Sequence, residues 1–253
     1  MRLVAYSRGD VAGSNIAGIL RSEFKLDGKL FVECDDFATN VSFLTDLKPE
    51  VCFIASRHRS ESKMPTLTAH VTGNFGKAEL GGEDRELALA PALYLREAVR
   101  GLLKYGSNSG CSISLEVTHH GPTNLPFPLV FVEVGSALEQ WNDLNACRIA
   151  AKVINDLMAC KPEKVPVAIG FGGPHYAPNF TAVIEKVALG HIMSKYAIEH
   201  ASKEMIKQMI EKTVPKPQLA LFDWKGLSGG EKQMIIAILD ELNLPWKKTS
   251  ELK

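Results

Sequence analysis

The fold is decided by the stretch Glu116-Val-Thr-His-His-Gly-Pro-Thr-Asn-Leu-Pro-Phe-Pro-Leu-Val-Phe-Val-Glu-Val-Gly-Ser136. It contains parts of two apolar runs, 112–118 and 129–134, which are typical of buried strands and lie on either side of a Gly-Pro turn. Ser136 and Glu139 then match the capping box Ser-x-x-Glu, which predicts a helix that continues to about residue 160. Two strands followed by a helix indicate an α/β protein.

Strand-like and helix-like segments alternate along the rest of the chain as well. Strands are predicted at 2–6, 29–34, 51–55, 67–71, 165–169 and 218–222, and helices at 10–21, 84–102, 180–188, 202–213 and 228–243. This alternation predicts a mixed, mostly parallel sheet flanked by helices, in a single domain that covers residues 1–253. In such folds, ligands bind at the carboxyl ends of the strands.

The composition is that of a soluble globular enzyme, with 45% apolar and 23% charged residues. No apolar run reaches the roughly 18 residues that a membrane span needs, and the first residues lack the pattern of a signal peptide, so we expect a cytoplasmic protein without a membrane segment. Five cysteines without Cys-x-x-Cys spacing argue against a disulfide framework. Because 29 basic and 29 acidic residues cancel, no global positive field favours tight, non-specific binding of nucleic acid.

Four of the seven histidines lie in three segments that glycine or proline interrupts. His70 lies in the first segment, His119 and His120 in the second, and His175 in the third. The second and third segments, and the dipeptide Gly135-Ser136, each follow a predicted strand. We therefore expect one composite site at the ends of these strands.

The spacing from Glu116 to His120 suits a metal site. Alternation along an extended strand places Glu116 and His120 on one face, whereas His119 reaches the same site only if the chain turns before Gly121. Imidazole and carboxylate side chains together suit zinc, whose catalytic sites use three protein ligands and an open position for water. In the alternative interpretation, one histidine is a core residue with satisfied hydrogen bonds and the other is exposed.

Two further features carry candidate chemistry. Glu133 is a carboxylate within an apolar run, so we expect a metal ligand or a general base whose pKa burial raises; the alternative is a strand-end residue paired with a surface Lys or Arg. The glycine-rich turn Gly170–His175 follows a predicted strand. Its backbone at Phe171, Gly172 and Gly173 suits an oxyanion, unless the glycines serve only the geometry of the loop.

Several side chains suit the phosphates of an extended substrate. Arg57, His58 and Arg59 belong to the densest basic segment of the chain, for which a solvated loop is the alternative. The predicted helix starts at Ser136 and Ser228 offer free backbone amides to a phosphate.

Motifs that are absent narrow the choice of reaction. The segment Leu227-Ser-Gly-Gly-Glu-Lys-Gln233 resembles the signature of ABC-transporter ATPases, but the chain contains no phosphate loop of the form G-x-x-x-x-G-K-[ST], so we expect no ATP hydrolysis. Ser228 and Glu231 instead match a capping box. The chain contains no His-Glu-x-x-His helix and no Gly-x-Gly-x-x-Gly loop, which argues against an NAD enzyme, and a serine hydrolase is not expected either.

Four segments, in this order, resemble the archaeal- and plant-type D-aminoacyl-tRNA deacylase family. They are 56–60, 69–76, 116–123 and 170–178, and the resemblance extends over nearly the whole chain. It implies hydrolysis of the ester that links a D-amino acid to the 3′-terminal adenosine of tRNA. It also implies a phosphorylase- or hydrolase-like three-layer α/β fold and a requirement for one or two zinc ions.

The residues and the resemblance together suggest a mechanism. Zinc activates a water molecule for attack on the ester carbonyl, and Glu133, His120 or His175 takes part in proton transfer. The aminoacylated 3′ end of tRNA is the expected partner, and the protein is expected to be a monomer. The zinc ligands are expected to come from the set His70, His119, His120, His175 and Glu116.

Three alternative functions stay open at this stage. The same ester could be hydrolysed without a metal, or the centre could serve a metallopeptidase or amidohydrolase that acts on a small amide. The third alternative is a non-catalytic module that binds the end of an RNA. Zero net charge and the absence of aromatic stacking motifs weigh against such a module.

Overall fold

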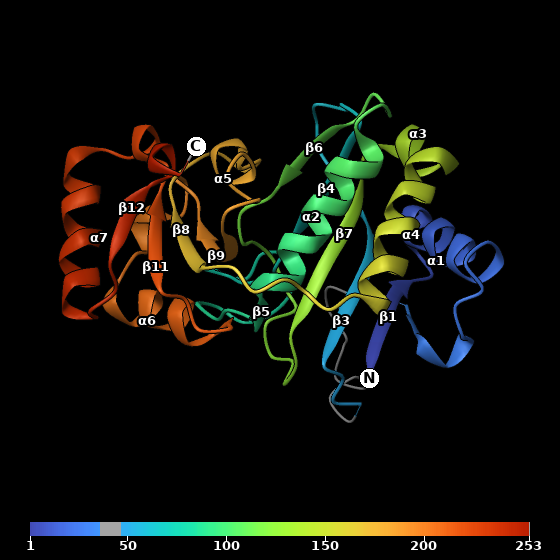
Figure 1. The fold of residues 1–253 in the computed structure, drawn as a ribbon, viewed down its shortest axis with the longest axis horizontal. Helices are drawn as coiled ribbons and strands as arrows, with labels where there is room; N and C mark the ends of the chain where they lie inside the picture. Colours follow the sequence, from blue (N-terminus) through green and yellow to red (C-terminus); the bar gives the residue numbers. More distant parts are fainter. Residues whose placement is uncertain (36–46, 253) are drawn as a thin grey trace.

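The computed structural model describes residues 1–35 and 47–252, and most of its strands lie in two main sheets (Figure 1). The larger sheet contains, in spatial order, β2 (Phe31–Cys34), β1 (Arg2–Ser7), β3 (Val51–Arg59), β7 (Leu129–Ser136), β4 (Thr66–His70) and β6 (Ser112–Leu115). Neighbouring strands in it are parallel, except that β4 and β7 are antiparallel. We call it the six-stranded sheet.

The second main sheet has four parallel strands. They are β12 (Trp246–Lys248), β11 (Leu219–Phe222), β8 (Val167–Phe171) and β9 (Ala188–Met193). The short strands β5 (Ala90–Pro91) and β10 (Thr213–Val214) form a separate pair. The helices are α1 (Val11–Ser22), α2 (Ala92–Gly106), α3 (Leu138–Trp141), α4 (Leu144–Ala159), α5 (Pro178–Thr181), α6 (Lys203–Glu211) and α7 (Gly229–Glu241), with 3-10 turns at η1 (Gly28–Leu30), η3 (Ile198–His200), η4 (Trp224–Gly226) and η5 (Thr249–Glu251).

Helices cover one face of the six-stranded sheet and join it to the four-stranded sheet. Helices α1, α2 and α4 contact that face, where Phe53 and Val132 belong to the largest hydrophobic core. Helix α2 also contacts β9, and the same core includes Leu189 and Leu221 of the four-stranded sheet (Figure 1). Helices α6 and α7 share a second core with that sheet. A core common to both sheets supports the prediction of one domain, which stays a prediction.

In the part of the chain that the structure describes, the other face of the six-stranded sheet is covered by a loop. Its apolar side chains, including Ile54 and Phe131, pack against Leu125 and Phe127 from the segment between β6 and β7. Because this segment also carries residues 116–120, the loop-covered face is the one that adjoins the candidate site.

The predicted α/β class with mixed, mostly parallel strands is confirmed, although the strands are divided between two main sheets. Asp10 caps α1 by accepting a hydrogen bond from the amide of Gly13 (2.8 Å), and Ser228 and Glu231 form the predicted capping box of α7. The strands predicted at 2–6, 67–71 and 218–222 are present with shifts of one residue at their ends. Short apolar runs with clear boundaries therefore predicted these elements well.

The helix predicted from residue 84 is wrong in its first part. Helix α2 begins at Ala92, and the preceding Ala90–Pro91 forms β5. Pro91 explains the difference, because a proline lacks an amide proton and clashes with the preceding turn inside a helix. Leu87 lies outside the helix and is buried in the second core.

The helix predicted from Ser136 to about residue 160 is also wrong in its first part. Ser136 is the last residue of β7 and does not cap a helix; its hydroxyl donates a hydrogen bond to the carbonyl of Met64 (2.7 Å). The helical region is divided into α3 and α4, and Asp143 caps α4 by accepting from the amide of Asn145 (2.8 Å). The Ser-x-x-Glu pattern was overridden by the pairing of β7 with its neighbours.

Other boundaries differ for local reasons. Strand β3 continues to Arg59, β6 ends at Leu115, and the helix predicted at 180–188 is limited to α5. Strand β9 was not predicted, since Gly190 and His191 interrupt its apolar pattern. Gly190 is required there because a Cβ atom would lie 2.2 Å from the hydroxyl of Thr213. Within the described ranges, no helix combines the length and the hydropathy needed to cross a membrane.

Candidate active site

The candidate site is built on residues 116–120, where the two main sheets meet. The amide of Glu116 donates to the carbonyl of Ala69 at the end of β4 (3.1 Å), and the amide of Val117 donates to the carbonyl of His175, which follows β8 (3.1 Å). The segment is therefore held by backbone hydrogen bonds from both sides. Because β6 ends at Leu115, residues 116–120 do not follow the strand alternation on which the sequence prediction relied.

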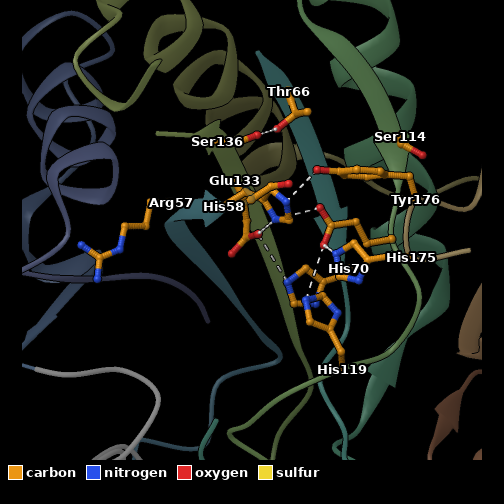
Figure 2. Close-up of polar contacts among 12 residues, drawn as sticks. Arg57, His58, Thr66, His70, Ser114, His119, Glu133, Ser136, His175 and Tyr176 are labelled. Atoms are coloured by element: carbon orange, nitrogen blue, oxygen red, sulfur yellow. Dashed lines mark hydrogen bonds and ion pairs between the residues drawn. The ribbon is translucent and has the colours of Figure 1, made fainter. Parts of the chain in front are cut away.

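Three further side chains project from the loop-covered face of the six-stranded sheet. His58 lies on β3, Glu133 on β7 and His70 on β4, and β7 is the strand between the other two (Figure 2). One oxygen of Glu133 lies 3.4 Å from Nδ1 of His58 and 3.7 Å from Nε2 of His70. All three residues are buried, so β7 places an acid between two buried imidazoles.

Glu116 lies at the centre of a second set of histidines. Its Oε1 is 3.1 Å from Nδ1 of His58, and its Oε2 is 3.1 Å from Nε2 of His175 and 3.5 Å from Nε2 of His119. The Glu116 side chain is completely buried, yet among residues 1–35 and 47–252 neither of its oxygens has a hydrogen-bond partner. Two carboxylates and five of the seven histidines thus form one cluster.

The backbone orients three of these imidazoles in the same way. Nδ1 of His70, His119 and His120 lies 3.2, 2.8 and 2.6 Å from the carbonyl oxygens of Val71, Val117 and Gly121, respectively. A carbonyl only accepts, so each Nδ1 must donate, and the lone pair of each ring is then on Nε2. This is the arrangement by which proteins commonly orient histidine ligands of a metal.

The donor set fits zinc. Ligand atoms within 4.8 Å of one another occur in the groups His70–His119–His120 and His58–Glu116–His175, and also between His70 and the two carboxylates. Ligands of tetrahedral zinc at about 2.0–2.1 Å lie roughly 3.3 Å apart, which is close to the two 3.1 Å contacts of Glu116. Within residues 1–35 and 47–252, no Lys or Arg forms an ion pair with Glu116 or Glu133.

The pKa values of the residues in the cluster are shifted from their usual values, some upward and some downward. Burial raises the pKa of Glu133, but the neighbouring His58 and His70 outweigh burial and hold the pKa well below its usual range. Burial lowers the pKa of His58 and His70, but Glu133 and Glu116 outweigh it and raise the pKa of both. Burial lowers the pKa of His120 to about 4, and it also lowers the pKa of His119. Glu133 is therefore ionised at neutral pH, whereas His119 and His120 are neutral.

The structure brings together all five residues of the predicted ligand set, but it changes two expectations. Glu116 contacts His119, which was expected to need a chain turn, and His120 lies beside His70 instead (ring centroids 4.8 Å apart). The prediction that burial raises the pKa of Glu133 is wrong, since two histidines stabilise its carboxylate. The alternative of pairing with a surface Lys or Arg is wrong for the same reason.

His58 and Tyr176 are members of the site that sequence reasoning missed. His58 was expected among phosphate-binding residues, but its ring is buried between Glu116 and Glu133. The hydroxyl of Tyr176 lies 2.9 Å from Nε2 of His58 and so orients Nδ1 toward the two acids (Figure 2). The sequence signal for His58 is strand alternation: if the strand predicted at 51–55 is extended to residue 59, His58 lies on the same face as Ile54.

The glycine-rich turn does not present the expected oxyanion site. Phe171 is buried in β8 and packs against Phe222, with ring centroids 5.4 Å apart. Gly172 has a φ of +93°, and its amide donates to the carbonyl of Met193 (2.8 Å). Gly173 has a φ of +81° and packs against Gly226. A Cβ atom on Gly226 would lie only 2.8 Å from the nitrogen of Gly173. The glycines serve the geometry of the loop, and His175 reaches the cluster beyond it.

The remaining predicted residues lie around or away from the cluster. Arg57 and Arg59 are on the end of β3 instead of a following loop, and the guanidinium of Arg57 points away from the histidines (Figure 2). Ser136 is buried at the end of β7, beside a cavity that both arginines also line. Ser228 caps α7 and lines none of the cavities beside the cluster. A phosphate role for Ser228 therefore has no support from its position.

His191 is buried outside the cluster and permits a stability prediction. Burial lowers its pKa to about 3, whereas a histidine in an unfolded chain has a pKa of about 6.5. Between these values only the unfolded chain binds the proton, so the contribution of His191 to stability is complete above pH ~6.5 and is lost as the pH falls toward 3. Between pH 7.5 and 5, we expect the wild type to lose about 2 kcal/mol more unfolding free energy than His191→Gln. Urea denaturation at both pH values measures this, and equal losses in both proteins would contradict it.

The fold and the site define an α/β protein with a buried histidine–carboxylate centre that could hold metal ions. The sequence matches the D-aminoacyl-tRNA deacylase family over residues 45–247, and the chain belongs to this family. It is 37% identical to a D-aminoacyl-tRNA deacylase of Thermococcus kodakarensis, over 96% of this chain and 98% of the relative. It is 34% identical to a D-aminoacyl-tRNA deacylase of Pyrococcus furiosus, over 98% of this chain and 100% of the relative.

The fold is also found in a solved structure. A crystal structure of a conserved protein of unknown function superimposes with a TM-score of 0.91, at 26% sequence identity, over 100% of this chain and 96% of that one. The similarity includes both main sheets, since it covers the whole chain.

Proposed function

We propose that this chain hydrolyses the ester bond of D-aminoacyl-tRNA and releases the free D-amino acid and the tRNA. Its membership of the D-aminoacyl-tRNA deacylase family supports the substrate. The observation that carries the chemistry is the buried cluster, in which Glu116 lies within 3.5 Å of three histidine nitrogens and has no hydrogen-bond partner in the part of the chain that the structure describes. A folded protein retains such a carboxylate when it has a cation to bind.

We propose zinc as the cofactor of this centre. His70, His119 and His120 would hold one ion, and His58, Glu116 and His175 would hold a second. Bound zinc lowers the pKa of a coordinated water toward ~7 and polarises the carbonyl oxygen of an ester. The two groups share no residue, which supports the choice of two ions.

The chain's own residues supply the orientation and the proton transfer. Glu133 is ionised and lines the cavity beside His119 and His120, so its carboxylate is in the correct form to take a proton from an attacking water. Tyr176 and the backbone carbonyls orient the imidazoles, which limits the motion of the centre during the reaction. We therefore assign Glu133 the role of general base and the five histidines, with Glu116, the role of ligands.

Removal of zinc is expected to abolish hydrolysis. After dialysis against a strong chelator, we expect release of D-tyrosine from D-tyrosyl-tRNA to fall at least ~10³-fold, and one to two equivalents of zinc to restore it. The same preparations are assayed on L-tyrosyl-tRNA and on a small D-tyrosyl amide. Full activity without metal would favour the metal-independent esterase, amide cleavage would favour the amidohydrolase, and tRNA binding without any release would favour the non-catalytic module.

A further inference from the structure

Two cavities open onto the histidine cluster. One has a volume of about 620 Å³, the other about 610 Å³, and both are lined by Leu80, His119, His120 and His175. The reacting ester of an aminoacyl-tRNA also has two sides, an amino acid and a nucleotide chain. A substrate whose two sides occupied the two cavities would place its ester over this shared wall.

The second of these spaces, which we call the arginine cavity, is lined by Arg57 and Arg59 and extends away from the cluster. Both arginines also line a neighbouring cavity of about 800 Å³, together with Lys63 and Trp141. The guanidinium of Arg57 lies 5.2 Å from the ring centre of Trp141, whose indole nitrogen donates to the carbonyl of His58 (3.0 Å). Cations and an aromatic ring along a connected path suit the phosphates and bases of a single-stranded RNA end.

Four acids also line these two cavities. Asp35 pairs with Arg8 (3.9 Å), Glu133 is buried between His58 and His70, and the charge of Glu61 is offset by Lys63. The fourth acid is Asp10. Its carboxylate accepts hydrogen bonds from the amides of Gly13 and Arg57, both at 2.8 Å, and is buried as the cap of α1. Its charge is therefore directed into the protein, whereas the guanidinium of Arg57 extends away from the cluster.

The other space, which we call the tyrosine cavity, has a different character. Phe75 forms a buried part of its wall, and Tyr196 is 67% exposed at its edge. Lys77 and Glu79 contribute one charge of each sign, so the lining has no excess charge for a polyanion. A concave site with apolar walls and a few polar groups suits a single amino-acid side chain, and about 620 Å³ is within the usual size of small-molecule sites.

The backbone also connects the wall of the tyrosine cavity to the cluster. The segment 73–76 begins three residues after His70 and includes Phe75. Gly76 lies against the ring of His200, and a Cβ atom on Gly76 would be only 2.5 Å from Nε2 of that ring. The amide of Gly73 donates to the carbonyl of His120 (2.8 Å). The walls of this cavity are thus fixed relative to the proposed ligands.

We infer that the two cavities bind different parts of the substrate. The RNA 3′ end lies in the arginine cavity and in the neighbouring cavity of about 800 Å³, and the D-aminoacyl group lies in the tyrosine cavity. This inference rests on the proposed function, and it places the ester over the shared wall of His119, His120 and His175. Arg57 and Arg59 then determine affinity for tRNA whatever amino acid it carries. Tyr196 and its neighbours determine which side chains are accepted.

The first arm of the test changes the arginine cavity. The double variant Arg57→Gln/Arg59→Gln is expected to raise KM about tenfold or more for D-alanyl- and D-tyrosyl-tRNA alike, and to raise the inhibition constant of uncharged tRNA by the same factor. Its binding should depend less on salt, by about 0.7 in the log–log slope for each lost phosphate contact. Arg148→Gln removes an exposed arginine that pairs with Glu23 on another surface and is the matched control.

The second arm changes the tyrosine cavity. Tyr196→Ala and the filling variant Ala197→Phe are expected to change the ratio of kcat/KM for D-tyrosyl- over D-alanyl-tRNA at least about tenfold, with the filling variant reducing it. Uncharged tRNA should inhibit both variants as it inhibits the wild type. Melting temperatures within a few degrees of the wild type show that the variants are folded.

The reverse pattern would overturn the division of the substrate: arginine variants that alter side-chain preference, or tyrosine-cavity variants that weaken inhibition by uncharged tRNA. Equal effects of both sets on both readouts would overturn it as well. Failure of the proposed function is distinguishable, because the wild type itself would then release no D-amino acid.

Discussion

Glu116→Gln is expected to lower kcat/KM for D-tyrosyl-tRNA at least ~10³-fold and to remove zinc from the group His58–Glu116–His175. The substitution keeps the size of the side chain but removes the charge that faces three histidine nitrogens within 3.5 Å. A neutral amide is a poor ligand for zinc, which prefers imidazole, thiolate and carboxylate. The effect is large because the side chain is completely buried, so solvent does not compensate for the lost charge.

Zinc content and thermal stability separate this loss from simple unfolding. Zinc at 1,000 times its dissociation constant stabilises a folded protein by about 4 kcal/mol for each site. We expect this zinc-dependent rise in Tm in the wild type and a reduced rise in Glu116→Gln, with at least one equivalent of zinc lost. Asp223→Asn is the matched control, since Asp223 is also buried but accepts a hydrogen bond from Asn179 (3.0 Å) outside the cluster. Unchanged zinc content in Glu116→Gln would contradict its role as a ligand.

Glu133→Gln is expected to lower kcat about 10²–10⁴-fold with little change in KM, because general-base catalysis contributes an effect of this size. Unlike Glu116, Glu133 lines the arginine cavity, and its carboxylate is ionised at neutral pH. The amide of glutamine cannot take the proton of an attacking water. Single-turnover rates on D-tyrosyl-tRNA measure the chemical step directly.

The zinc content of this variant decides between two roles for Glu133. We expect it to equal that of the wild type, since neither proposed ligand group needs Glu133. Loss of zinc would identify Glu133 as a ligand with His70 and Glu116, which the geometry also allows. Retention of both zinc and activity would contradict its role as a base.

Local sequence patterns predicted the elements that are stabilised by contacts between residues close together in the chain. Asp10 before an apolar periodic run, and Ser228 with Glu231, started helices because each cap depends only on nearby amides. The same type of pattern at Ser136 did not, since the pairing of β7 with β3 extends through this residue. Pro91 is a local signal that determines the start of α2, and it outweighs the apolar periodicity of the preceding residues.

By itself, the sequence determined the α/β class, the family resemblance and most of the proposed ligands, because glycine- and proline-bounded histidines after strands are a local signal. The tertiary structure decided how these residues combine. The junction of two sheets places His175 beside Glu116, and the order of β3, β7 and β4 places Glu133 between His58 and His70. These contacts join residues that are far apart in the chain, and their distances depend on strand register and hydrogen bonding between sheets, which no local pattern encodes.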